Sequence, residues 1–163
     1  MKEQSLALMG SRRARLFHHP AEDDRMSQEN VELARRWFNE VWNERRTDLI
    51  CELTASECCG YAASGEHIDR DQFTAFHAEF TSAFPDLHID IESTVAERDE
   101  VVVRWTATGS HDGGGFGLEA THRPIEMHGL TWFRVRNGMF VEARDCWNAD
   151  RMMNELRIAT THG

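Results

Sequence analysis

The sequence lacks a long apolar run. Its 163 residues contain no stretch near the roughly 18 consecutive apolar residues that a membrane-spanning helix needs. The N-terminus also lacks the apolar core of a secretory signal, because LALMG is short and is followed by the basic SRRAR. These absences predict a cytoplasmic protein with no membrane contact.

Positive charge is scarce as well. The chain has 18 Lys and Arg against 28 Asp and Glu, a formal net charge of −10. Nucleic acids and anionic membranes would repel such a chain, so neither is expected as a partner. The length suits one domain with a substantial core.

Cysteines are few and poorly spaced for cross-linking. The four are Cys51, Cys58, Cys59 and Cys146, and no CxxC pair occurs. Two adjacent cysteines cannot easily form a normal disulfide. We therefore expect reduced thiols, as in a cytosolic protein.

Common metal, nucleotide and nucleophile motifs are missing. No HxH or HExxH occurs, and the only closely spaced histidines are His18 and His19. The glycines at 113–115 do not continue into a phosphate-binding loop, and there is no GxSxG elbow. We predict neither a metal nor a cofactor.

The N-terminal part contains helical patterns. Residues 1–26 show no sustained period and are expected to be a disordered tail or an extension, so the predicted domain covers residues 27–160. Ser27 is a suitable N-cap for a first helix. Its apolar positions recur at helical spacing: Val31, Ala34, Trp37, Phe38, Val41 and Trp42.

Two more helices follow. A short one is expected from Thr47, and residues 55–67 are expected to be irregular. Asp69 and Gln72 then form a capping-box pattern, and Pro85 ends the third helix. One face of that helix is lined by Phe73, Phe76, His77, Phe80 and Phe84.

Period-two alternation dominates the second half. It predicts strands over 87–91, 101–111, 125–135 and 139–147. Asn137-Gly138 favours a type I′ turn between the last two. Helices followed by a strand meander predict an α+β fold, with about three N-terminal helices on one face of a curved sheet and a pocket at its open end.

Asp145 is the leading candidate for chemistry. Strict alternation from Phe140 would bury Glu142 and Arg144, which is costly. A β-bulge between Val141 and Ala143 would instead turn Ala143, Asp145 and Trp147 inward. The alternative is a rim carboxylate paired with an arginine.

Other candidates share the inward phase. His111 could orient a carboxylate or bind a carbonyl, or it could be a strand-end histidine facing solvent. Trp105 is a core residue or a wall of the pocket. The stripe of Trp37, Phe38 and Trp42 mostly packs, but part of it could face flat ring-containing ligands.

Four segments carry a family resemblance. They are ENVELARRWFNEVWNERRTDLICEL, FTSAFPDLHIDIE, VVVRWTATGSHDGGGFG and GLTWFRVRNGMFVEARDCW, and they lie within residues 28–157. The sequence resembles the SnoaL-like polyketide cyclases of the nuclear-transport-factor-2-like superfamily. The resemblance implies a cone-shaped α+β barrel and a cofactor-free aldol cyclisation of a polyketide ester. It places the acid/base at Asp145 and also matches His111. Asn148 and His122 depart from common family residues.

The leading hypothesis is therefore a cofactor-free enzyme acting on a hydrophobic carbonyl compound. Asp145 and His111 would be catalytic, and the substrate would contact Phe38, Trp42, Trp105, Phe116 and Trp147. The alternative is a non-catalytic ligand-binding or assembly module of the same fold. An open pocket holding Asp145 favours the enzyme, and a pocket filled by Trp105 and Trp147 favours the module. Apolar residues on the outer sheet face predict a homodimer: Val102, Leu130 and Trp132.

Overall fold

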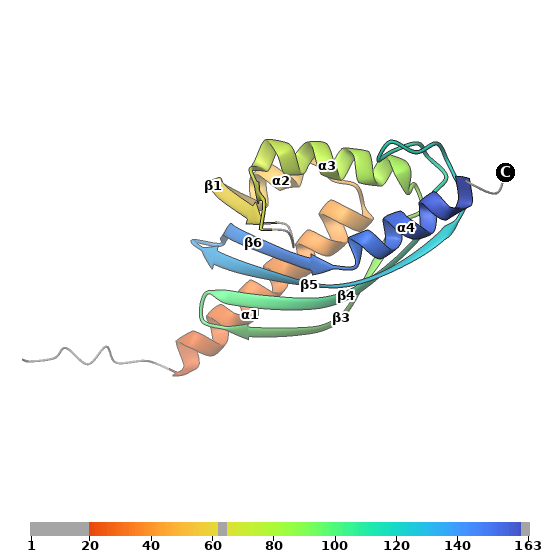
Figure 1. Cartoon of the computed structure of the whole chain (residues 1–163). Helices are drawn as coiled ribbons and strands as arrows, with labels where there is room; N and C mark the ends of the chain where they lie inside the picture. The colour runs from red at the N-terminus through yellow and green to blue at the C-terminus, as the bar shows by residue number, and fades with distance from the viewer. Residues whose placement is uncertain (1–19, 62–64, 161–163) are drawn as a thin grey trace, which may run out of the picture.

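One curved, six-stranded sheet carries the fold (Figure 1). The computed structural model describes residues 20–61 and 65–160. In spatial order the strands are β2 (His67–Ile68), β1 (Thr54–Tyr61), β6 (Met139–Trp147), β5 (Pro124–Arg136), β4 (Glu100–Ser110) and β3 (His88–Glu97). Neighbours are antiparallel except β1 and β6, which are parallel. Within these described residues β2 and β3 are edges, so the sheet stays open and does not close into the barrel that the resemblance implies.

The four strands predicted from alternation are all present as β3 to β6. The turn between β5 and β6 is also confirmed. Asn137 has φ 52° and Gly138 has φ 72°, and a type I′ turn requires a positive φ at both central residues.

The expectation of irregular structure over residues 55–67 is wrong for the part that the structure describes. Thr54–Tyr61 forms β1, which places Gly60 beside Ala143 and Tyr61 beside Arg144 of β6. Its sequence, TASECCGY, is rich in small residues and shows no clear alternation. β1 forms because pairing satisfies the free backbone edge of β6, an effect that local strand propensity does not report.

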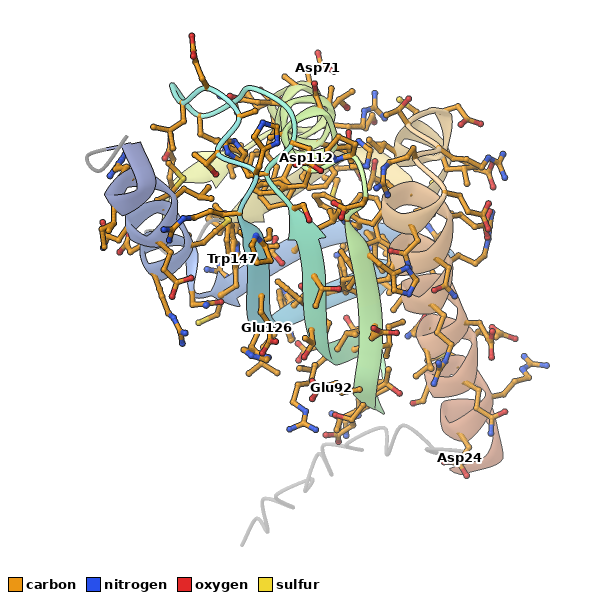
Figure 2. All side chains as sticks on the ribbon, turned by 90° about the vertical axis from the view of Figure 1, so that its right-hand side faces the viewer. Asp24, Asp71, Glu92, Asp112, Glu126 and Trp147 are labelled. Carbon is orange, nitrogen blue, oxygen red and sulfur yellow. The ribbon has the colours of Figure 1, made fainter. Side chains whose placement is uncertain are left out.

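The first helix begins earlier than expected. α1 spans Pro20–Arg36, so Ser27 lies within the helix and is not its N-cap. Proline suits a first helical position, where its fixed φ is compatible and no N–H is needed. Figure 2 shows Asp24 at the projecting end of α1. The helix continues into a π-helical segment, η1 (Trp37–Asn43), which buries Trp37, Phe38 and Val41. Residues 1–19 of the expected tail lie outside the described residues.

The next two helices are confirmed. α2 spans Asp48–Leu53 with Thr47 at its N-cap position. α3 spans Arg70–Ala83 and begins with the predicted capping box between Asp69 and Gln72. α4 (Ala149–Thr160) follows β6 at the end of the sheet.

The core lies between these helices and the concave face of the sheet, as expected (Figure 1). Every second residue of β4 and β5 points to it. The fully buried positions include Val101, Val103, Ala107, Met127 and Phe133. The apolar stripe of α1 and η1 covers the same face. The open end of this core holds the pocket described next.

Candidate active site

An aromatic pocket lies between α3, η1 and the concave face of the sheet. The space open to the centre of a water molecule is about 110 Å³, enough for several waters. Eleven of the 25 lining residues are aromatic: Trp37, Phe38, Trp42, Tyr61, Phe73, Phe76, Phe80, Trp105, Phe133, Phe140 and Trp147. Such a wall suits a flat, hydrophobic ligand.

A β-bulge turns Asp145 into this pocket. Val135 pairs with Phe140 and Arg134 pairs with Glu142, so Val141 is the extra residue on β6. Beyond the bulge, Ala143, Asp145 and Trp147 all line the pocket. The predicted bulge is confirmed, one residue closer to the turn than expected. It allows Glu142 and Arg144 to stay on the outer face, where they form an ion pair at 2.8 Å.

A hydrogen-bond chain holds the Asp145 carboxyl. The hydroxyl of Thr131 donates to its Oδ1 at 2.6 Å. Trp105 Nε1–H donates in turn to the hydroxyl oxygen of Thr131 at 2.9 Å. Asp145 and Thr131 are directly paired across β6 and β5. Oδ2 has no protein hydrogen bond within the described ranges and is available to a ligand.

Burial shapes the acidity of Asp145. The carboxyl lies deep in the protein and reaches solvent only in part, through the pocket. Loss of water around the carboxylate raises the pKa of Asp145 above its ordinary 3.8, and the Thr131 hydrogen bond offsets part of that rise. The rim-carboxylate alternative does not fit this position. No arginine pairs with Asp145 among the described residues.

Gly129 makes room for the indole of Trp105. The two residues are directly paired across β5 and β4. A Cβ atom on Gly129 would lie 2.2 Å from Cζ2 of Trp105, far closer than any real contact. The missing side chain therefore lets the indole lie flat over β5 and reach Thr131.

His111 is not brought to the pocket. It follows β4 and is fully buried, but its ring packs on Phe84 at 5.3 Å between centroids. Its Nδ1 lies 3.1 Å from Thr121 Oγ1 and accepts the backbone N–H of Thr121 at 3.2 Å. This position does not fit the expectation that His111 is a catalytic residue that orients a carboxylate or binds a carbonyl in the pocket. The loop between β4 and β5 closes around the histidine, which sequence phase alone cannot show.

The aromatic candidates divide in the same way. Phe38, Trp42, Trp105 and Trp147 line the pocket, where a ligand could contact them. Trp147, labelled in Figure 2, packs against Phe80 of α3, with 6.0 Å between the two ring centroids. Phe116 does not line it. Its ring packs behind the pocket wall on Phe80 and Phe84, with 5.5 Å and 6.3 Å between the ring centroids.

Several lining residues were missed from the sequence. Thr131 has the same inward phase on its strand as Phe133, so the sequence could have placed it in the pocket. Its role depends on its hydrogen bonds to Trp105 and Asp145, which the sequence does not show. Cys58, Gly60 and Tyr61 arrive with the unpredicted β1, and Arg70 arrives at the start of α3. Burial raises the pKa of the Cys58 thiol to about 11, so this cysteine is protonated at neutral pH.

Neither a metal centre nor a membrane span is found in the described part of the chain. No three His, Cys, Asp or Glu side chains lie together there in a way that could hold an ion. No helix among the described residues is long and apolar enough to cross a membrane.

An open, curved α+β sheet with an ionisable carboxyl in an aromatic pocket defines a class of small-molecule-binding proteins. The profile of the SnoaL-like polyketide cyclases matches residues 32–156, so the chain belongs to this family and the resemblance is confirmed. No curated protein matches the sequence significantly.

Solved structures agree with this assignment. A protein from Jannaschia sp. CCS1, provisionally described as a SnoaL-like polyketide cyclase, is 25% identical, with a TM-score of 0.75 over 85% of this chain and 95% of its own. IdmH from Streptomyces antibioticus, provisionally a polyketide cyclase, is 25% identical, with a TM-score of 0.68 over 78% and 97%. AclR from Streptomyces galilaeus, provisionally a hydroxylase, is 23% identical, with a TM-score of 0.73 over 81% and 86%, and shows the shared fold.

Proposed function

We propose that the protein is a cofactor-free acid/base enzyme acting on a hydrophobic carbonyl compound, as an ester cyclase does. The observation that carries this proposal is Asp145, a carboxyl with a raised pKa and one free oxygen in an aromatic pocket. A raised pKa makes the carboxylate a better base at neutral pH and keeps it able to return the proton.

The proposed reaction is the carbon–carbon bond-forming step of an intramolecular aldol condensation. Asp145 takes a proton from the carbon next to a carbonyl, which leaves an enolate. The enolate carbon attacks a second carbonyl carbon of the same molecule, forming a carbon–carbon bond and an alkoxide. The carboxylic acid of Asp145 then returns its proton to the alkoxide. Protons and electrons balance without any other reactant.

Thr131 and Trp105 have a positioning role in this proposal. The indole N–H occupies a lone pair of the Thr131 oxygen, which directs the Thr131 proton to Oδ1 of Asp145. The carboxyl is thereby fixed, and Oδ2 is the oxygen that would face the substrate. A group fixed before the reaction avoids the cost of ordering it in the transition state.

Hydrogen exchange tests the proton transfer without knowledge of the natural substrate. 2-Acetonaphthone is flat and hydrophobic and carries exchangeable protons next to its ketone. In D2O we expect the protein to accelerate deuterium uptake at that methyl group, measured by mass spectrometry. Asp145→Asn should reduce the acceleration by at least about 10²-fold, the usual contribution of one positioned acid or base.

Asp90→Asn is the matched control, because Asp90 is an exposed carboxylate on β3 outside the pocket. It should leave exchange unchanged. Equal exchange by wild type and Asp145→Asn would refute the catalytic role and favour the ligand-binding module. The open pocket with Asp145 in its wall is the arrangement that supports the enzyme.

We also propose that the protein works in the cytoplasm as a homodimer that buries the outer face of the sheet. Leu130 is 47% exposed there, and Val102 and Trp132 are directly paired and half-buried. The free cysteines suit a reducing compartment. Light scattering should give about twice the mass of an 18.8 kDa chain. Leu130→Glu should halve the measured mass, and the control Met26→Glu should leave it unchanged. A wild-type monomer would exclude the dimer.

A further inference from the structure

Among the residues that the structure describes, Arg70 is the only basic one that lines the pocket. It is the first residue of α3, directly after β2 and the N-cap Asp69. Its Nε is shielded from solvent and has no hydrogen-bond partner in the described part of the chain. Figure 2 looks along α3 and shows the next residue, Asp71, pointing away from the sheet. Arg70 thus brings a cation into a largely apolar wall whose carboxylates are Asp69 and Asp145.

The described fold gives this guanidinium no structural duty. No ion pair of Arg70 with a carboxylate is formed within residues 20–61 and 65–160. Its neighbour Asp69 is engaged elsewhere, because the Asp69 side chain accepts the backbone N–H of Gln72 at 2.8 Å. An arginine donor that is removed from water without a partner is costly, so such a group is kept where something binds to it.

The positive charge of Arg70 contrasts with the negative charge of the chain as a whole. The net charge of −10 would repel an anionic ligand from most of the surface. One positive group in the pocket wall offsets that repulsion locally. The planar guanidinium also matches the two oxygens of a carboxylate, which few other side chains do.

We propose that Arg70 binds a carboxylate of the pocket's ligand. The natural ligand is then a flat, hydrophobic keto acid. This inference rests on the proposed function for the position of the reacting carbonyl at Asp145, but the carboxylate site itself does not depend on catalysis.

The sheet order places the two groups on different sides of β1. β1 lies between β2, which leads into Arg70, and β6, which carries Asp145. Strands in a sheet are about 4.8 Å apart, so β2 and β6 are separated by about 10 Å. A ligand that reaches both groups must therefore be long, and a fused two-ring system between the acid and the ketone meets that requirement.

The test compares 6-acetyl-2-naphthoate with its methyl ester, which has the same rings and ketone but no charge. Titration calorimetry should show that wild type binds the acid at least about 10-fold more tightly than the ester, as one hydrogen bond to a charged group would give. Arg70→Met should remove that preference, and Arg70→Lys should restore part of it. Arg151→Met, an equal charge change on α4 outside the pocket, should keep it.

The outcomes separate the two proposals. Equal affinity of wild type for acid and ester, or no binding of either, overturns the Arg70 site. The same preference in Arg70→Met also overturns it. If the preference depends on Arg70 but neither probe gains deuterium next to its ketone, the carboxylate site stands and the catalytic proposal fails.

Discussion

Thr131 and Asp145 form the central polar contact of the pocket, with the Thr131 hydroxyl 2.6 Å from Oδ1 of Asp145. The contact depends on two features of the sheet. The bulge at Val141 aligns the two residues across β5 and β6, and Gly129 lets Trp105 reach the Thr131 oxygen. Each feature can be tested by substitution.

Thr131→Val should impair both stability and proton transfer. It removes the donor to Asp145 and leaves the buried Trp105 N–H without its acceptor, which costs about 1–3 kcal/mol of unfolding free energy. Since the lost hydrogen bond stabilises the carboxylate, the pKa of Asp145 should rise. The rate of hydrogen exchange in 2-acetonaphthone should then rise with pH as in wild type, but the rise should occur at a higher pH.

Thr131→Ser keeps the hydroxyl and serves as the control. Its pH profile should overlay that of wild type. An unchanged profile in Thr131→Val would show that the contact does not tune Asp145.

Gly129→Ala should displace the Trp105 indole, because the new Cβ would meet the ring at 2.2 Å. We expect a loss of about 1–3 kcal/mol, as is usual for overpacking. Denaturant unfolding followed by tryptophan fluorescence measures it. Combining the change with Trp105→Leu should remove most of the added cost, because the clashing ring is gone. Additive effects in that double mutant would contradict the packing explanation.

Local signals predicted much of this fold. Asp69 and Gln72 identify the start of α3, and Asn137-Gly138 identifies the last turn, because each pattern satisfies backbone geometry within a few residues. The inward position of Asp145 was also predictable, since burying Glu142 and Arg144 would have been costly.

Features set by distant partners were not predictable in the same way. β1 depends on the free edge of β6, and His111 is drawn to Thr121 by a loop whose course has no sequence signature. The helical pattern of α3 alone does not show that Arg70, its first residue, faces a pocket. Only the arrival of β1 and β2 beside β6 makes it part of the pocket.

A chain starting at Met26 should remain folded, which tests the proposed domain of residues 27–160. Asp24, Arg25 and Met26 are exposed, and the first buried side chain from residue 24 onward is Asn30, which donates to the Arg98 carbonyl at 2.8 Å. The melting temperature should fall by no more than about 2 °C, since exposed positions contribute little. A larger loss in calorimetry would mean that the removed segment packs on the domain. Asn30→Ala, which breaks a described contact, should be more damaging than the truncation.

The ionisation of Asp145 should make stability depend on pH. Its pKa is higher in the folded protein than the ordinary 3.8, so the folded state binds the proton more tightly than the unfolded state. This contribution is fully present below the unfolded pKa and is lost as pH rises through the folded pKa. Asp145→Asn lacks the titration. Its unfolding free energy relative to wild type should therefore increase from pH 4 to neutral pH in urea titrations. Asp90→Asn should show no such trend. A difference between Asp145→Asn and wild type that stays constant over this range would mean that folding does not raise the pKa of Asp145.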